Sequence, residues 1–353
     1  MTLKLGIEIP YTDLQNRDDL IALAREAEDL GYDSIWCSEV YTYDTFTTLT
    51  HIAANTQRIK LGTNIAQIYA RTPALLATTA ASLDQLSGGR FILGVGASGP
   101  QVIEGWHGVA YDRPVTRTRE IIDICRMIWS GERVSYHGKV FTLDKGLKLL
   151  NAGHRPDIPV YVASLGPKNV QMTAEIAEGW LPFPFSSEKG AEVFAEPLAA
   201  GRQSRSPERG PLRIAPMTPA FLGDERQGLD VARGLIGFYI GGMGSREQNF
   251  YNKLVQRYGF VDEAKTVQDL FLSKQHAEAI AATPDALVDQ VCVIGDEARA
   301  KDRLQAFESA GATELVVAFL AGDEASRSTP FAFLGSDREV RSQMMQALAR
   351  ANG

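Results

Sequence analysis

Two glutamates near the start of the chain lie in or just beyond short apolar runs. Glu8 lies in the run at residues 3–9, and Glu39 follows the run at residues 34–38. A carboxyl group in apolar surroundings can act as a general acid, a general base or a hydrogen-bond partner, because burial raises its pKa. For Glu8 the alternative is structural, with the carboxylate bound by a backbone amide or an arginine beneath the site.

A glycine-bearing segment at residues 163–169 (ASLGPKN) leads from an apolar run into a helical pattern. Ser164 offers a hydroxyl, Gly166 lets the backbone approach a ligand closely, and Lys168 adds positive charge. Free amides at the start of a helix bind phosphate with help from the helix dipole. The alternative is a plain strand-to-helix turn with proline in the first helical turn.

A second glycine-rich segment, residues 94–100 (GVGASGP), also follows an apolar run and suits close contact with a ligand. It is no dinucleotide fingerprint, because the third glycine and the acidic residue of a following strand are missing. It is no serine nucleophile elbow either. The five histidines show no metal-ligand spacing. Only His107 falls in a loop expected to reach a site; Trp106 beside it could cover a planar ligand, although packing is the more common role of such a pair.

Alternating strand and helix patterns must position these residues. Apolar runs predict eight strands, at residues 3–9, 34–38, 59–64, 91–95, 158–163, 179–182, 212–221 and 313–319. Helical spacing predicts helices at residues 18–30, 45–56, 73–86, 115–129, 168–178, 187–203, 298–311 and 338–351. Parallel neighbours need a dozen or more connecting residues, so this alternation indicates right-handed crossovers. The strand count favours a closed (β/α)8 TIM barrel over an open doubly wound sheet.

Two stretches interrupt this repeat and are predicted to be insertions in one domain spanning residues 1–353. Residues 131–157 contain a hairpin pattern around His137-Gly138, and residues 223–282 form a helical region. The glycine-rich centre of the second stretch, residues 235–244, suits helix packing at a subunit contact, with a substrate loop as the alternative. Ligands of such barrels bind at the carboxyl ends of the strands, so we expect both glutamates and both glycine-bearing segments to face one mouth.

Composition narrows the classes of function. The 353 residues include 36 Lys and Arg and 43 Asp and Glu, a net charge of −7, with no basic cluster for a nucleic acid. The three cysteines lie far apart, which fits a reducing compartment and no zinc site. No signal-peptide core and no apolar run near the roughly 20 residues that span a bilayer is present. We therefore expect a cytoplasmic protein with no membrane partner.

An ordered set of short segments carries the most specific signal. They are LGIE (5–8), GYDSIW (31–36), IKLGT (59–63), RTP (71–73), LDQLSGGR (83–90), LGVG (93–96) and PVYVASLGP (159–167), with echoes at IG (294–295) and GATEL (311–315). Together they resemble the bacterial luciferase-like superfamily, in particular its coenzyme F420-dependent branch, which includes methylenetetrahydromethanopterin reductase. Each segment is weak alone, and the set covers the first half of the chain densely.

The resemblance implies a deazaflavin, coenzyme F420, in the mouth of the barrel with its ring against the third strand. It implies a non-proline cis peptide at Asn64-Ile65 that backs the ring as a bulge, and a phosphate near the segment at residues 164–166. The cofactor-binding residues expected are Ser38, Thr63, Asn64, Ile65, Ala97, Ser98, Gly99, Gln101, Ser164, Leu165, Gly166 and Lys168. Glu39 and Glu8 are the catalytic candidates, and no metal is expected.

One departure from the family pattern affects proton transfer. Relatives often end the second strand with an Asp-His or Glu-His pair, whereas this chain has Glu39-Val40. Glu39 alone, Tyr41 or Tyr43 then handles the proton, or the substrate needs none. We therefore do not expect the sugar-phosphate dehydrogenase activity of one family member, and similarity to the pterin reductase does not fix the substrate.

The leading expectation is an F420-dependent oxidoreductase that transfers a hydride between the deazaflavin C5 and a small organic substrate. The alternative is an FMN-dependent two-component monooxygenase on the same barrel, and a non-catalytic flavin-binding barrel is a third possibility. The resemblance also implies a homodimer. Its contact would come from the glycine-rich helix near residues 237–244 or from the helices after the second and third strands.

Overall fold

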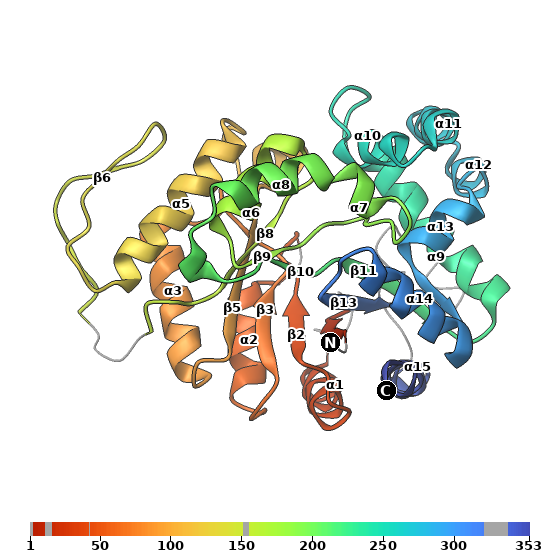
Figure 1. The fold of residues 1–353 in the computed structure, drawn as a ribbon, viewed down its shortest axis with the longest axis horizontal. Coiled ribbons are helices and arrows are strands. Elements are labelled where there is room, and N and C mark those ends of the chain that lie inside the picture. Colours follow the sequence, from red (N-terminus) through yellow and green to blue (C-terminus); the bar gives the residue numbers. More distant parts are fainter. Residues whose placement is uncertain (1–2, 11–15, 42, 151–154, 321–337) are drawn as a thin grey trace. The chain divides into compact units, whose positions relative to one another are not determined.

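The computed structural model describes residues 3–10, 16–41, 43–150, 155–320 and 338–353. Contacts between Cα atoms divide the chain into two compact units. Unit I comprises Met1–Ile35, Pro182–Glu196 and Arg213–Gly353, and unit II comprises Trp36–Leu181 and Pro197–Leu212. Each unit contains parallel strands accompanied by helices (Figure 1).

Unit II carries most of the predicted site residues. Its strands are β3 (Lys60–Thr63), β4 (Ala66–Gln67), β5 (Phe91–Gly96), β8 (Val160–Ala163), β9 (Gly179–Trp180) and the end of β2 (Ser34–Cys37). The strand order is β2-β3-β5-β8-β9, with β4 also on β5, and the pairings from β3 to β9 are parallel. Its helices are α2 (Thr45–Ala53), α3 (Pro73–Leu86), α4 (Pro100–Gly105), α5 (Pro114–Trp129), α6 (Pro167–Ile176) and most of α8 (Ala195–Gln203), with a 3₁₀ turn at Pro207–Arg209.

Local sequence accounts for α3, which has the bounds predicted. The Thr72 side chain accepts a hydrogen bond from the Leu75 N–H at 3.3 Å, and Pro73 occupies the first helical turn. Leu76, Ala80 and Leu83 recur at helical spacing and are buried. The helix packs against both α2 and α5 (Figure 1).

Unit I has its own parallel strands. They are β1 (Lys4–Glu8), β11 (Met217–Leu222), β12 (Val293–Gly295) and β13 (Glu314–Phe319), in the order β1-β13-β11-β12, and β10 (Arg213–Ile214) precedes β11. Its helices are α1 (Arg17–Asp29), α7 (Gly190–Val193), α9 (Glu225–Gly242), α10 (Phe250–Arg257), α11 (Val261–Leu272), α12 (His276–Ala281), α13 (Asp285–Val291), α14 (Glu297–Ser309) and α15 (Arg338–Asn352). Every residue of β13 is buried, as is typical of a parallel strand covered on both faces.

The predicted alternation of strands and helices is confirmed at most positions. The helix predicted at residues 187–203 is two helices, α7 and α8, and α4, α13 and β4 were not predicted. The strand predicted at residues 212–221 is two strands, β10 and β11, with Ala215 and Pro216 between them. Strand β12 was not predicted. That strand has only three residues and ends at Gly295, whose φ is 121°, so its apolar run is too short to stand out.

The segment at residues 131–157 contains the predicted hairpin, formed by β6 (Tyr136–His137) and β7 (Thr142–Leu143). The buried Glu120 carboxylate on α5 anchors its tip by accepting hydrogen bonds from the N–H groups of Lys139, Val140 and Phe141 at 2.6, 3.0 and 2.9 Å. A Cβ on Gly138 would lie 2.3 Å from this carboxylate, so a larger residue there would displace the Glu120 side chain.

The segment at residues 223–282 is helical, as predicted, and contains α9 to α12. Helix α9 contacts both β11 and β12, so it also serves as the crossover between those strands. The assignment of both segments as insertions in one domain stays a prediction. Within the described ranges, no helix is long and apolar enough to cross a bilayer.

Candidate functional site

The junction of β3 and β4 in unit II departs from regular strand geometry. Pairing with β5 matches Gly62 with Ile92 and Ala66 with Val95, so a step of 66 − 62 = 4 residues faces a step of 95 − 92 = 3. The extra residue makes this junction a β-bulge. The Asn64–Ile65 peptide bond within the bulge is cis, at the position predicted.

Two glycines of β5 make room for this bulge. A Cβ on Gly94 would lie 1.8 Å from the carbonyl oxygen of Thr63, and a Cβ on Gly96 would lie 2.8 Å from Cγ1 of Ile65. These glycines were expected to admit a ligand, but the structure shows that they admit the neighbouring strand. The open glycine of this segment is Gly99, where the nearest atom to an added Cβ lies 3.8 Å away.

Hydrogen bonds fix the bulge on both sides. The Thr63 hydroxyl donates to the Gly94 carbonyl at 2.7 Å and accepts from the Gly94 N–H at 2.9 Å. The Asn64 N–H donates to the Cys37 carbonyl, and the Ser38 hydroxyl donates to the Asn64 carbonyl, both at 2.8 Å. The Thr63 side chain has no exposed surface, so its contact with a ligand stays a prediction, whereas Asn64 and Ile65 are partly exposed.

Glu39 lies just beyond the end of β2 and is buried. The Arg71 guanidinium donates to both of its carboxylate oxygens, each at 2.6 Å. One of these oxygens also accepts from the Gln67 N–H at 3.0 Å, and the Gln67 side-chain amide donates to the Glu39 carbonyl at 2.8 Å. The arrangement considered for Glu8 was a carboxylate bound by a backbone amide or an arginine, and the structure shows both partners for Glu39.

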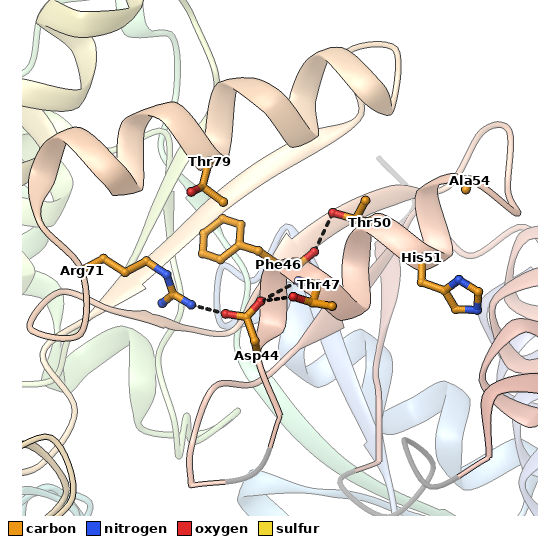
Figure 2. A pocket seen from close by; sticks show the side chains of 8 residues that line it. All are labelled: Asp44, Phe46, Thr47, Thr50, His51, Ala54, Arg71 and Thr79. Carbon is orange, nitrogen blue, oxygen red and sulfur yellow. Dashed lines mark hydrogen bonds and ion pairs between the residues drawn. The ribbon is translucent and has the colours of Figure 1, made fainter.

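Arg71 extends this network toward the surface, where it bonds Asp44 and lies over the Phe46 ring at 4.8 Å from the centroid (Figure 2). Asp44 caps α2 by accepting from the Thr47 N–H at 2.6 Å and the Thr47 hydroxyl at 2.7 Å. Burial opposes ionisation of Asp44, but the Thr47 donors and Arg71 outweigh it and lower the pKa of the carboxyl. Burial also disfavours the Arg71 charge, but bonds to Glu39 and Asp44 raise its pKa.

The loop after β5 carries the predicted residues Ala97, Ser98 and Gly99, and Gln101 lies in the first turn of α4. Ser98 has φ 58°, a left-handed conformation that is uncommon outside glycine. Its carbonyl accepts from the Tyr111 hydroxyl at 3.3 Å, and the Tyr111 ring stacks on Tyr69 with centroids 5.2 Å apart. The Tyr69 hydroxyl donates to the Asp112 carbonyl at 2.7 Å. Tyr69 and Tyr111 thus position this loop beside the end of β4.

The turn between β8 and α6 holds the predicted residues Ser164, Leu165 and Gly166, and Lys168 lies in the first turn of α6. Within the described part of the chain, the N–H groups of Leu165, Gly166 and Lys168 have no hydrogen-bond acceptor. The Ser164 hydroxyl lies 2.9 Å from that of Thr173, which itself donates to the Asn169 carbonyl at 2.8 Å. Ser164 therefore donates to Thr173. Backbone amides, and not the Ser164 hydroxyl, are the donors available to an anion.

The remaining candidates are placed as follows. Glu8 ends β1 in unit I and is buried. In the described ranges, no cluster of three or more His, Cys, Asp or Glu side chains is arranged to hold a metal ion. Nε2 of His107 is buried and has no hydrogen-bond partner there.

Sequence reasoning gave no role to Arg71, Gln67, Tyr69 or Tyr111. Arg71 belongs to the RTP segment at residues 71–73, which contributes to the family resemblance but was given no function. Gln67 binds Glu39 through both its backbone N–H and its side-chain amide, and these contacts depend on the fold and not on a local sequence pattern. The tyrosine pair joins residues 42 positions apart, since 111 − 69 = 42.

Comparisons with known proteins bear on both fold and chemistry. The family model described as luciferase-like monooxygenase matches residues 5–314. A Mycobacterium tuberculosis (strain ATCC 25618 / H37Rv) protein, provisionally named a coenzyme F420-dependent oxidoreductase, is 37% identical over 329 residues, covering 89% of this chain and 94% of that protein. The 5,10-methylenetetrahydromethanopterin reductase of Archaeoglobus fulgidus is 28% identical over 335 residues, covering 92% and 96%.

A solved structure agrees with these relatives. The coenzyme F420-dependent tetrahydromethanopterin reductase from Methanopyrus kandleri matches with a TM-score of 0.76 at 24% identity, covering 98% of each chain. This likeness, together with the family match, confirms the predicted fold class, the (β/α)8 TIM barrel of luciferase-like proteins.

Proposed function

The chain belongs to the luciferase-like monooxygenase family, whose model matches residues 5–314, and from this premise we propose an F420-dependent oxidoreductase. The proposed reaction transfers a hydride between the deazaflavin C5 and a small organic substrate. The relative that is 37% identical favours F420 as the cofactor, and the family membership makes the chain an enzyme. One observation carries the proposal. The turn between β8 and α6 has three backbone N–H groups with no acceptor among the described residues, and it belongs to the same unit as the β-bulge that contains the cis peptide bond.

The residues present fit such a cofactor. An added Cβ on Gly166 would meet no atom within 4 Å, so the space beside the free amides is open. These amides precede or begin the ten-residue helix α6, whose dipole favours an anion at this end. The partly exposed Asn64 and Ile65 would support a planar ring, and the loop from Ala97 to Gln101 its edge or tail.

When bound, a deazaflavin supplies a two-electron hydride at its C5. The contribution of the chain is to hold the ring and the substrate in line and to exclude water. Glu39 holds Gln67 and Arg71, so we propose that it fixes the bulge in preference to moving a proton. Glu8 remains our candidate for proton handling or for a substrate hydrogen bond.

Titration with F420, followed by the visible spectrum of the deazaflavin, tests this proposal. We expect binding at micromolar concentrations. Gly166→Glu should weaken binding about 10-fold or more, because its carboxylate would enter the open space beside the phosphate donors. Gly166→Gln is the matched uncharged control. Both variants should unfold at the same temperature as the unmodified protein, because the backbone φ of Gly166 is −70°, which residues with side chains also adopt.

Failure of F420 to bind at micromolar concentrations would contradict the cofactor assignment. Equal binding by the Glu and Gln variants would leave the cofactor in place but would contradict the position of its phosphate.

The family description favours one second candidate, an FMN-dependent monooxygenase that uses oxygen and a partner reductase. The two candidates differ in which reduced cofactor the protein consumes. The visible spectrum of the purified protein, and oxidation of reduced FMN compared with reduced F420, separate them.

We also propose that the chain forms a homodimer through the face of α2 and α3. Of the two contacts expected from the sequence, the glycines of α9 are already covered, because a Cβ on Gly241 or Gly242 would lie 2.6 Å from Phe271. The exposed positions of α2 and α3 are uncharged and include Thr47, Thr50, Leu75, Thr78, Ser82 and Leu86. A groove of about 720 Å³ lies along this face, and its lining includes His51, Thr79 and the Asp44–Arg71 ion pair (Figure 2).

A charge placed on this face tests the dimer. Leu75 is 54% exposed, so Leu75→Arg should fold normally and yield a monomer, because desolvating an unpaired charge opposes association. Leu147→Arg is the control, since Leu147 is 74% exposed and lies outside α2 and α3. Sedimentation velocity measures the outcome. A dimer that persists in Leu75→Arg, or dissociates equally in Leu147→Arg, would show that the contact lies elsewhere.

A further inference from the structure

An aromatic pair joins two loops of unit II that carry predicted cofactor residues. Tyr41 follows Glu39 after β2, and Trp106 follows α4 in the loop after β5. Their ring centroids lie 6.4 Å apart with the planes inclined at 60°, an edge-to-face contact. Yet Tyr41 is 48% exposed and Trp106 65% exposed, so their contact leaves much of both rings in water.

This exposure sets Trp106 apart from the other tryptophans. Trp36, Trp129 and Trp180 are each at most 1% exposed. Covering an indole removes a large apolar area from water, which is favourable, so an exposed indole beside a second aromatic ring leaves much of that free energy to be gained by binding. Such a surface is typical of a binding site for a ligand or a partner.

Hydrogen bonds fix the backbone around Trp106. The Trp106 N–H donates to the Val102 carbonyl at 3.0 Å, and the Val109 N–H donates to the Ile103 carbonyl at 3.1 Å. The Tyr111 N–H donates to the Glu104 carboxylate at 3.1 Å. The indole is therefore presented by a hydrogen-bonded loop, which lowers the entropy lost when a ligand is bound.

The charge around the pair narrows the kind of ligand. Partial burial raises the pKa of Tyr41, so its phenol is neutral at pH 7. Of the charged side chains near Trp106 in the sequence, the Glu104 carboxylate accepts from the Tyr111 N–H, and Asp112 pairs with Arg117 on α5 at 2.7 Å. The Arg117 guanidinium covers the Tyr69 ring at 4.5 Å from its centroid. The pair thus offers π faces and no formal charge.

We propose that Tyr41 and Trp106 form the substrate-recognition surface of this enzyme and that they select planar, uncharged, conjugated or aromatic molecules. This inference rests on the proposed function for the identity of the ligand as the substrate. We expect a small molecule as the occupant, because the two rings lie in the chain segments that also carry the predicted cofactor residues Ser38 and 97–101. The flat faces of both rings suit stacking, which a saturated ring cannot reproduce.

Trp106 itself supplies the measurement. As the exposed tryptophan, it should account for the acrylamide-accessible part of the emission. We expect cinnamamide, planar and neutral, to reduce this quenching about twofold or more, while cinnamate and 3-cyclohexylpropanamide leave it unchanged. Equilibrium dialysis of cinnamamide should show roughly 2- to 10-fold weaker binding to Tyr41→Leu and to Trp106→Leu. Leu150→Ala is the control at an exposed site elsewhere, since Leu150 is 90% exposed.

Equal protection by the saturated amide or by cinnamate would overturn the proposed selectivity. Protection that grows with protein concentration alone would show that a second copy covers the pair, and would also overturn it. The titration is done without F420, whose binding is followed separately by its own visible band. Loss of F420 binding with cinnamamide protection intact would refute the cofactor assignment and leave the aromatic site standing.

Discussion

Gly94→Ala is expected to destabilise the protein by about 3 kcal/mol or more and to reduce F420 binding at least about 10-fold. The new Cβ would lie 1.8 Å from the carbonyl oxygen of Thr63, which is backbone and cannot rotate away. Strand β3 must therefore move from β5 at the bulge. The Thr63 hydroxyl would then lose its two bonds to Gly94, and Asn64 and Ile65 would lose their position. Urea unfolding and F420 titration measure the two effects.

Gly105→Ala is the matched control for this prediction. Gly105 lies in the same unit, at the end of α4, and an added Cβ there would meet no atom within 4 Å. Its stability should change by less than about 1 kcal/mol. If Gly94→Ala unfolded at the same urea concentration as Gly105→Ala, the close approach of β3 to β5 would be refuted.

Local patterns made most of the fold predictable. The bounds of α3 follow from a threonine cap, a proline in the first turn and apolar residues at helical spacing, all of which lie within the helix or directly beside it. The missed β12 shows the limit of this reasoning. Its three residues are identified as a strand by their pairing with β11, which begins 293 − 217 = 76 positions earlier.

The candidate site was predictable only where backbone geometry is repeated within the family. The cis peptide at Asn64–Ile65 came from the resemblance and is confirmed. The role of Gly94 was misassigned, because a glycine that admits a ligand and a glycine that admits a neighbouring strand look identical in a sequence. The Glu39–Arg71 pair was missed because it joins residues 71 − 39 = 32 positions apart, and only the fold brings them together.

That pair yields the second large effect. Arg71→Met is expected to destabilise the protein by about 3–5 kcal/mol, because it leaves the Glu39 carboxylate buried without its cation. The side chains of Arg71 and Glu39 are 12% and 8% exposed, so water can replace the guanidinium only in part. Adding Glu39→Gln to Arg71→Met should recover most of the loss, since the double variant buries no charge. Urea unfolding of the two single variants and the double variant gives the coupling energy.

A surface pair in the same unit supplies the control and makes the test discriminating. Arg119 and Glu175 are 37% and 29% exposed, and Arg119→Met should cost about 1 kcal/mol or less. If Glu39 serves to hold Gln67 and the bulge, F420 affinity should fall in Arg71→Met and return in the double variant together with stability. Stability that returns without affinity would instead mean that the charge of Glu39 itself acts at the site, as a proton-handling role requires.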